Sequence, residues 1–484
     1  MDESDREKSE LLKKIAFTRA KYQESLRRNQ SLESELLAAE ETVAGLRQKL
    51  RAANRKRSEA EHYRSLLHQL RSRWYLRPFI PARQLLVPNE DAADCWKFRG
   101  PRFAPPADSA AYGRRRVLIV GHLLSSLLFG SENSLLDLIA TVDPSRFDVF
   151  VVFPEQNDSV FVRLQTQVQG IAVLDYRWWR LGRPAPEESV AAFEALLRQL
   201  AIDLVHVNTI MIQDPLIAAR RLRIPTIVHA RELISLDDEL VGRIGGAPPD
   251  IVKAVCENAT HLLANSSTTL TQFECGDRGS FLYNSVDERS FDLPNSVDPH
   301  CVKVGMISSN IRKKGVFEFV ELASLAERTV PTLQFYLIGP MTPLTEGWQS
   351  GRGRLPANFH FRDYVSPPAA AYRDLNIVLN LSRFAESFGR TVAEAMMARR
   401  PVIAYHHGAL PELINDGETG FLVPYLDLSS VLDRLSFFAG NPAKITEFGE
   451  AARRRSLQLF SRDVFAQEIN SLYERLIANA PKAK

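Results

Sequence analysis

Short apolar runs alternate with stretches of helical periodicity over most of the chain after Arg116. The first runs, Val117–Val120 and Val149–Phe153, are continuous apolar segments of the length expected for buried strands. The same pattern continues in Ile171–Leu174, Leu204–Val207, Thr226–His229 and His261–Ala264, with helical stretches at Glu132–Ile139, Val190–Leu200 and Pro215–Leu222 between the runs. Strands that alternate with helices predict a parallel sheet covered by helices.

The alternation restarts after a break near residues 292–299. Strands are predicted at Val302–Ile307, Gln334–Ile338, Phe359–Phe361, Asn376–Leu381, Pro401–Tyr405 and Phe421–Val423, with helices at Val316–Arg328, Arg390–Arg399 and Ser429–Ala439. We therefore predict an α/β chain of two Rossmann-like doubly wound domains, residues 116–295 and 296–484, that face a cleft. The last helix is expected to pack back on the first domain. Because the chain has no GxxxxGK[ST] and no GxGxxG after the first strand, a P-loop NTPase or a classical dehydrogenase is disfavoured.

Residues 1–75 have a different pattern, with no proline from about Asp5 to Tyr75 and a single glycine, Gly45. Apolar residues fall at the a and d positions of a heptad repeat from Asn29 to Ala53, among charged and polar neighbours. This predicts a coiled coil that makes the protein a homo-oligomer. A single long helix packed on its own domain is the alternative.

Two segments interleave cations with aromatic residues. The first includes Arg71, Arg73, Trp74, Tyr75, Arg77 and Phe79 and leads into a proline-containing linker over residues 76–115; the second is Tyr176-Arg177-Trp178-Trp179-Arg180. Such clusters suit the interface of an anionic membrane, and packing on the protein itself is the alternative for both.

Composition narrows the function classes. The chain has 484 residues, 45% hydrophobic and 25% charged, which is typical of a globular protein, and its net charge of +3 is too balanced for a dedicated nucleic-acid binder. Four cysteines stand far apart without a CxxC pair, so we expect neither a disulfide framework nor a zinc site, as suits a reducing cytosol. The charged start predicts no secretory signal, and no apolar run reaches the roughly 18 residues of a membrane span. We expect a cytoplasmic protein that can attach to the inner face of the cell membrane.

The segment NIVLNLSRFAESFGRTVAEAMMARRPVIAY carries the clearest chemistry. Glu386 lies in the loop after a predicted strand, and Glu394 lies within the next helix, which Ser387-Phe388-Gly389 opens. Arg390 and Thr391 stand in the first turn of that helix, where free N–H groups and the helix dipole attract phosphate. Glu394 is placed to accept hydrogen bonds from a ribose diol, and Glu386 to bind sugar hydroxyls or stabilise positive charge. The alternative to a functional site is that the two glutamates belong to a solvated helix face.

This segment resembles the retaining glycosyltransferases of GT-B fold, specifically glycosyltransferase family 4. Glu386 and Glu394 match the family's E-x7-E motif in the context E-x-F-G-x-T-x-x-E-A-M, and GALPELINDGETGFLV at residues 408–423 matches a second motif, with Ala409 in place of a glycine. Further matches are Asn284-Ser285-Val286-Asp287, Ala264-Asn265-Ser266 and Phe129-Gly130-Ser131-Glu132-Asn133. The resemblance covers roughly Arg116 to the C-terminus.

The resemblance implies a nucleotide-diphosphosugar donor held mainly by the second domain, and an acceptor held mainly by the first. Glu394 would hold the ribose and Glu386 the sugar, the backbone around Phe388 and Gly389 would contact the donor sugar, and Lys314 would bind the diphosphate.

Other basic and small residues complete the implied site. The family usually has an arginine where this chain has Met306, and we expect Arg312 from the same loop to compensate. His229, at a strand end, matches a histidine that lines the donor-sugar site, with structural packing as its alternative. Gly130 and Ser131 begin the first domain's long helix, where backbone can approach a phosphate.

We expect no essential metal, because no Asp-x-Asp pair ends a strand and cations with a helix dipole already supply positive charge. No cofactor beyond the sugar nucleotide is expected.

The sequence therefore predicts a retaining, metal-independent glycosyltransferase that transfers a sugar to a glycan or lipid-linked glycan in surface polysaccharide synthesis. Without a convincing covalent nucleophile, front-face attack assisted by a donor phosphate oxygen is favoured. Two alternatives stay open, a sugar-nucleotide 2-epimerase on the same fold and a coiled-coil scaffold with an inactive transferase domain.

Overall fold

The computed structural model describes residues 97–98, 114–122, 130–155, 157–349 and 355–480. The predicted coiled coil over residues 1–75 lies outside the described residues, as does most of the predicted linker over residues 76–115. Both stay predictions.

The first domain is built on an eight-stranded sheet with the order β1-β4-β3-β2-β5-β6-β7-β8. Its strands are β1 (Lys97–Phe98), β2 (Arg115–Val120), β3 (Phe147–Phe153), β4 (Gly170–Val173), β5 (Leu204–Val207), β6 (Thr226–Ala230), β7 (His261–Ala264) and β8 (Gly279–Phe281). All neighbouring strands pair in parallel except β1, which pairs antiparallel with β4 at the edge. The central strands β2, β3 and β5 are buried over nearly their whole length, which explains their continuous apolar sequences.

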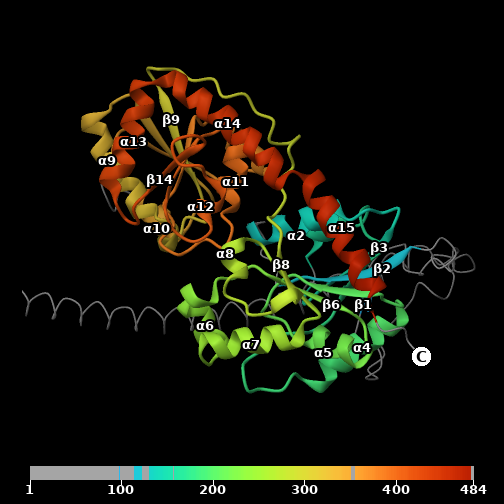
Figure 1. Cartoon of the computed structure of the whole chain (residues 1–484). Coiled ribbons are helices and arrows are strands. Elements are labelled where there is room, and N and C mark those ends of the chain that lie inside the picture. The colour runs from blue at the N-terminus through green and yellow to red at the C-terminus, as the bar shows by residue number, and fades with distance from the viewer. Residues whose placement is uncertain (1–96, 99–113, 123–129, 156, 350–354, 481–484) are drawn as a thin grey trace, which may run out of the picture. The chain divides into compact units, whose positions relative to one another are not determined.

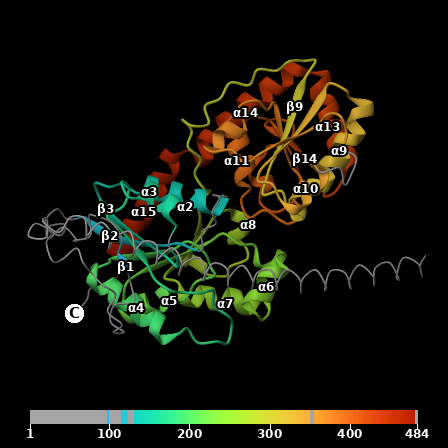
Figure 2. The ribbon, with the colours of Figure 1, turned by 180° about the vertical axis from the view of Figure 1, so that it is seen from behind.

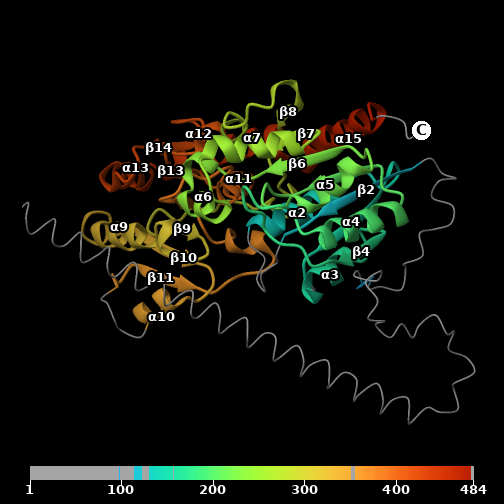
Figure 3. The same ribbon diagram turned by 90° about the horizontal axis from the view of Figure 1, so that it is seen from below.

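Helices cover both faces of this sheet. They are α2 (Gly130–Thr141), α3 (Asp158–Leu164), α4 (Glu187–Gln199), α5 (Asp214–Arg221), α6 (Asp238–Ile244), α7 (Pro248–Asn258) and α8 (Ser267–Leu270). One core lies between the sheet and α4, α5 and α7, and α4 and α5 lie side by side in Figure 3. The other core contains α2, α3 and the last helix of the chain, α15 (Arg462–Ala478), which runs beside α2 in Figures 1 and 2.

The second domain has a six-stranded, fully parallel sheet of order β11-β10-β9-β12-β13-β14. Its strands are β9 (Val302–Ile307), β10 (Leu333–Ile338), β11 (Phe359–Arg362), β12 (Ile377–Asn380), β13 (Val402–Tyr405) and β14 (Gly420–Val423). Its helices are α9 (Val316–Thr329), α10 (Pro343–Gln349), α11 (Arg390–Met397), α12 (Leu410–Leu413), α13 (Leu428–Gly440) and α14 (Pro442–Phe460). Helices α9 and α13 lie together on one face, and α11 and α14 on the other. The prediction of two Rossmann-like domains is confirmed.

The chain passes between the domains a second time at Ser461, where α14 ends and α15 begins. Helix α15 then adds Phe465, Ile469, Leu472 and Tyr473 to the core of the first domain. These apolar side chains fix the C-terminal helix on the first sheet.

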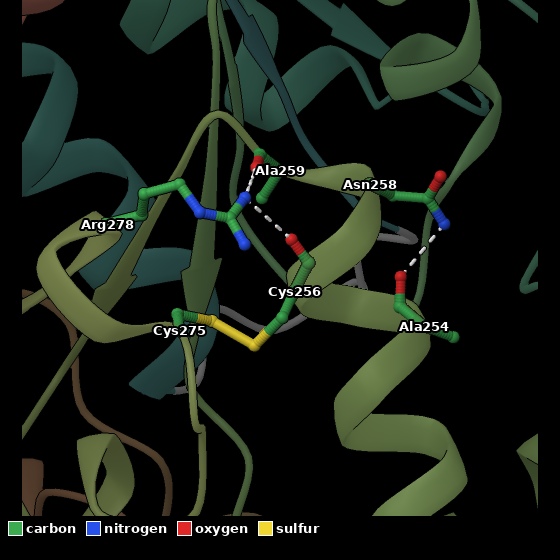
Figure 4. The surroundings of a disulfide bond; sticks show 6 residues. All are labelled: Ala254, Cys256, Asn258, Ala259, Cys275 and Arg278. Carbon is green, nitrogen blue, oxygen red and sulfur yellow. Dashed lines mark hydrogen bonds between the residues drawn. A yellow bond between two sulfur atoms is a disulfide. The ribbon is translucent and has the colours of Figure 1, made fainter.

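The structure contradicts the expectation that the cysteines are unpaired. Cys256, near the end of α7, forms a disulfide with Cys275, and their Cα atoms are 5.6 Å apart (Figure 4). Arg278 lies beside the bond and donates hydrogen bonds to the carbonyl oxygens of Cys256 and Ala259. The two cysteines meet because α7 and the short turn before β8 pack together, which their separation of 19 residues does not indicate. Cys301 carries a free thiol.

Tyr176 and Trp179 of the second aromatic and basic cluster are packed inside the first domain, whereas Arg177, Trp178 and Arg180 are exposed. Tyr176 donates a hydrogen bond to the carbonyl oxygen of Gly121, and the indole N–H of Trp179 donates one to Ile210. Both rings are buried, whereas Trp178 is 43% exposed and lies against Arg243. Packing therefore explains the two buried rings, and membrane contact by the exposed residues of the loop stays a prediction. In the described part of the chain, no helix combines the length and the apolar character needed to cross a bilayer.

Candidate active site

A cavity of about 370 Å³ lies at the carboxyl ends of β9, β10 and β12, where a doubly wound sheet binds its ligands. Helix α2 of the first domain contributes Gly130 and Asn133 to its wall. Glu386, Lys314, Glu394, Arg390 and Thr391 from the second domain also line it. Six of the residues named from the sequence, the five just given and Gly130, are thus brought together.

Glu386 and Lys314 form an ion pair in the wall of this cavity. The Lys314 Nζ atom is 2.9 Å from Glu386 Oε1, and the Ser382 hydroxyl donates a hydrogen bond of 2.7 Å to the same oxygen. Burial raises the pKa of Glu386, but Lys314 and the hydrogen bonds from Ser382 and Asn380 outweigh it and hold the pKa below its ordinary value. Glu386 is therefore an anion at neutral pH, and its charge is matched by one ammonium group.

Glycines shape the loop that carries Glu386. A Cβ atom on Gly408 would lie 2.4 Å from the carbonyl oxygen of Glu386, so no other residue allows this approach without displacement. Gly315, directly after Lys314, has a φ of +82°, and a Cβ there would lie 2.0 Å from the carbonyl oxygen of Leu381. Two glycines thus hold the two charged residues against the end of β12.

Glu394 is buried and both its carboxylate oxygens already have partners. Arg390 Nε donates to Oε1 at 2.7 Å, and the Tyr372 hydroxyl donates to Oε2 at 2.8 Å. Burial raises the pKa of Glu394 above its ordinary value, although Arg390 and these hydrogen bonds act against the rise. The carboxylate is thus held rigidly at the cavity, one turn inside α11.

Arg390 connects this carboxylate to the first domain. Its guanidinium lies 2.6 Å from Asp137 Oδ2 and donates a hydrogen bond to the Ser134 hydroxyl, and both residues belong to α2. Asp137 also pairs with Arg462, the first residue of α15, at 2.7 Å. One carboxylate of α2 therefore binds two arginines, one at the start of α11 and one at the start of α15.

A second set of contacts joins the domains beside the Glu386 loop. The carboxylate of Glu412 accepts hydrogen bonds from the backbone N–H groups of Ser267 and Thr268, at the start of α8. Asn265, which follows β7, donates a hydrogen bond to the Ser387 hydroxyl. The loop between the two glutamates is thus fixed from both domains.

Five of the residues named from the sequence lie outside the cavity wall. Phe388 is buried among aromatic rings, and Gly389, with a φ of +88°, forms the turn before α11. Ser131 is exposed and bonds Glu132. Arg312 is also exposed and lies 5.5 Å from the centre of the Phe317 ring, so it does not take the place of the arginine that Met306 replaces. His229 is fully buried in β6 and bonds His206 and Arg231.

The sequence reasoning missed Tyr372, Ser134 and Asp137. Tyr372 follows a short turn far from any recognised motif, and Ser134 and Asp137 stand on α2 at the i and i+3 positions that share one helix face. Polar residues at that spacing on a helix that also carries buried leucines were a signal that this face meets a polar partner.

In the described part of the chain, no three His, Cys, Asp or Glu side chains gather as a metal site would require.

Two family models match the chain, one on each domain. Residues 298–439 match the glycosyl transferases group 1, and residues 129–276 match the glycosyl transferase 4-like domain. The chain belongs to the GT-B glycosyltransferases and resembles family 4. The cavity lies at the sheet of the domain that matches the glycosyl transferases group 1. Helix α2, which contributes to the cavity wall, belongs to the domain that matches the glycosyl transferase 4-like domain.

Curated relatives match part of the chain. The poly(ribitol-phosphate) alpha-N-acetylglucosaminyltransferase of Staphylococcus aureus is 23% identical over 258 residues, which is 51% of this chain and 50% of the relative. The capsular polysaccharide biosynthesis glycosyltransferase CapM of Staphylococcus aureus is 23% identical over 224 residues, 46% of this chain and 57% of CapM. The chain thus spans about half the length of these relatives.

Solved structures show the same fold. Anabaena Alr3699/HepE in complex with UDP-glucose has a TM-score of 0.61 and 21% identity, and the match covers 75% of this chain and 100% of that one. TarM has a TM-score of 0.57 at 13% identity over 74% of this chain and 98% of its own.

Proposed function

We propose that the protein is a retaining glycosyltransferase that transfers a sugar from a nucleotide-diphosphosugar to a hydroxyl of a glycan or lipid-linked glycan. The observation that carries the proposal is the cavity at the carboxyl ends of β9, β10 and β12, where Glu394, Glu386 and Lys314 meet. Relatives named for poly(ribitol-phosphate) and for capsular polysaccharide support a role in surface polysaccharide assembly.

The charges in the cavity suit the parts of such a donor. Glu394, held by Arg390 and Tyr372, offers fixed acceptor oxygens to the two ribose hydroxyls. Lys314 and the N–H groups at the start of α11 face the diphosphate, which gains negative charge as the sugar leaves. Gly130 allows the backbone at the start of α2 to approach from the opposite side.

The environment of Glu386 favours a front-face reaction. Oε1 of its carboxylate accepts hydrogen bonds from both Lys314 and Ser382, so the group is a poor nucleophile. The bond between the anomeric carbon and the leaving phosphate oxygen breaks, and the acceptor oxygen bonds to the same face of that carbon. The acceptor proton passes to a phosphate oxygen of the departing nucleotide. Glu386 stabilises the positive charge that develops on the sugar.

The deciding experiment incubates the full-length protein with a panel of nucleotide sugars and follows thermal stability and slow hydrolysis. One or a few sugar nucleotides should raise the unfolding temperature, and the released or transferred sugar should keep its anomeric configuration. Glu394→Ala should weaken donor binding by about 1.5–3 kcal/mol, because it removes charge-assisted hydrogen bonds. Glu386→Ala should mainly lower turnover.

Three results would each point to another reading. Interconversion of the sugar at C2 without any acceptor supports an epimerase. The absence of binding and hydrolysis with every sugar nucleotide of the panel supports an inactive scaffold. Complete loss of activity in EDTA with rescue by Mn²⁺ contradicts the metal-independent diphosphate site that we propose around Lys314.

A further inference from the structure

A second group of polar side chains lies at the carboxyl ends of the first sheet. Asn208 directly follows β5, Arg231 directly follows β6, and Asn284 lies three residues beyond β8. Because the strands are parallel, these ends share one edge of the sheet. Arg231 joins the group, since its guanidinium donates to Asn208 Oδ1 at 2.8 and 3.0 Å and to Asn284 Oδ1.

The Arg231 guanidinium makes no direct contact with a carboxylate in this group. Its hydrogen bonds go to two carboxamide oxygens and to His229 Nδ1, and no ion pair found among the described residues includes it. Glu232, the next residue, instead accepts hydrogen bonds from Thr209 and from the Arg231 backbone N–H. Burial lowers the pKa of Arg231 to about 9, so the group remains a cation at neutral pH. The Glu232 carboxylate attracts this charge without a direct contact and offsets only part of the cost of burial, so a bound anion would offset more of it.

The same contacts determine where the proton of His229 lies. A guanidinium can only donate, so His229 Nδ1 accepts at 3.2 Å and the ring proton is on Nε2. His206 Nε2 also contacts Nδ1 at 3.2 Å, and His206 Nδ1 accepts from the Tyr473 hydroxyl. Burial lowers the pKa of both histidines, that of His206 to about 3, so both rings are neutral. His229 is therefore a hydrogen-bond donor through Nε2 and not a general base.

Two of these donors are buried without a partner in the described structure. The His229 Nε2 atom has none, and neither does the Asn208 Nδ2 atom, whose carboxamide oxygen is occupied by Arg231. Both side chains are fully buried, whereas Arg231 stays partly accessible to solvent. Buried donors in native proteins are nearly always paired, so the missing partner is expected to be a ligand that accepts hydrogen bonds.

We propose that Arg231, His229 and Asn208 bind an oxyanion, such as a phosphate group, of the acceptor substrate. This inference rests on the proposed function, because it assigns the chemistry of the acceptor. The donor is the less suitable source of the anion, since its diphosphate has Lys314 and the start of α11, and Arg231 is not among the described residues that line the donor cavity. The enzyme then acts on an acceptor that carries a phosphate or a similar anionic group near the hydroxyl that is glycosylated.

The test measures binding of sn-glycerol 3-phosphate and of glycerol to the full-length protein by calorimetry. A saturating nucleoside diphosphate, taken from the nucleotide screen, first fills the site at Lys314. Wild-type protein should bind the phosphate compound and not glycerol, and Arg231→Gln should weaken that binding by about tenfold or more, the equivalent of about 1.4 kcal/mol. Affinity for the nucleoside diphosphate should not change.

Arg220→Gln is the matched control. Arg220 also donates to an asparagine oxygen, that of Asn258, but it is exposed at the end of α5, so its loss should leave both affinities unchanged. If Arg231→Gln fails to fold by circular dichroism, Arg231→Lys decides. Lysine keeps the charge but cannot donate hydrogen bonds to Asn208, Asn284 and the ligand at the same time. We therefore expect an intermediate loss of affinity for glycerol 3-phosphate.

Three results would overturn the inference. Equal binding of glycerol 3-phosphate by wild type and the folded variants removes the oxyanion site. Loss of nucleoside diphosphate affinity in Arg231→Gln would instead assign the anion to the donor. Wild-type binding of a nucleoside diphosphate with no preference for glycerol 3-phosphate over glycerol would leave the proposed function standing and remove this inference alone.

Discussion

The strand ends of the two sheets carry charge in opposite ways. At the second sheet, Glu386 is paired with Lys314 and Glu394 with Arg390, so its charged groups balance within the protein. At the first sheet, Arg231 donates hydrogen bonds to neutral amides and a neutral histidine, and the neighbouring Glu232 carboxylate offsets its charge only in part. Balanced charges hold fixed positions before the substrate arrives, whereas an unbalanced cation selects the charge of what binds it. The two domains share a fold, and the difference lies in which side chains follow the strands.

The largest effect is expected from removing the cation of the second sheet. Lys314→Ala should lower turnover by a factor of about 10²–10³, the usual effect of losing one group that stabilises transition-state charge. Lys313→Ala is the control, because this neighbouring lysine is exposed and its ammonium group lies 5.4 Å from the centre of the Phe384 ring. Steady-state kinetics with the identified donor would measure both, and equal activities would show that the diphosphate is bound elsewhere.

The next effect concerns the contact between the domains. Asp137→Asn should reduce the free energy of unfolding by about 3 kcal/mol, because Arg390 and Arg462 each lose a buried partner. Glu474→Gln also removes an ion pair between α15 and the first domain, with Arg146, but that pair is exposed and its loss should cost less than about 1 kcal/mol.

Asp137→Asn should in addition weaken donor binding, since Arg390 then holds Glu394 less firmly, whereas Glu474→Gln should not. Chemical denaturation and nucleotide titration of both variants provide the comparison. Similar losses in both would mean that the contact is structural only.

The two glutamates should respond to acid with opposite signs. The lowered pKa of Glu386 means that its contribution to stability is complete above its ordinary pKa of about 4.3 and is lost as the pH falls through the lowered value. The raised pKa of Glu394 means that its contribution is complete below the ordinary value and is lost as the pH rises through the raised one.

Urea unfolding between about pH 3 and pH 7 should therefore show a smaller acid loss in Glu386→Gln than in wild type, and a larger one in Glu394→Gln. Parallel pH profiles for both variants would contradict the assigned ionisation of this site.

A smaller effect concerns the disulfide, which braces the first domain. Under non-reducing, denaturing conditions an alkylating reagent should label Cys301, whereas Cys256 and Cys275 should react only after reduction. Peptide mass spectrometry reads the labels directly. Labelling of all three without a reductant would restore the expectation drawn from the sequence.

No effect on transfer is expected from the N-terminal segment. Truncation before about Arg83 should convert an oligomer into a monomer that still transfers sugar to a soluble acceptor, because every proposed site residue lies beyond Arg116. Light scattering of both forms is the measurement. A full-length protein that is already monomeric would contradict the predicted coiled coil.

The sequence predicted twelve of the fourteen described strands to within two residues and missed the edge strands β1 and β8. Strand β5 and strand β9 have the predicted bounds, and β12 is shorter by one residue at each end. Buried parallel strands are continuous apolar runs, so the residue types around each strand end already indicate its limits. The nearness of Glu386 and Glu394 was predictable for the same reason, because one loop and one helical turn separate them.

The contacts that could not be predicted all join segments distant in the chain. Arg390 was expected at a phosphate, and the structure pairs it with Asp137, which is 253 residues away. Arg231 was visible only as part of a strand end, and its hydrogen bonds to Asn208 and Asn284 depend on strand ends that the fold brings together.

The sequence by itself determined the two alternating domains, the resemblance to the family and the position of the donor cavity at the second sheet. Only the tertiary structure decided the Cys256–Cys275 bond, the position of Arg312 away from the cavity and the state of His229. Periodicity and motif spacing are local properties that a chain carries in its sequence. Charge pairing and burial depend on which distant groups arrive beside a side chain, and packing alone sets that.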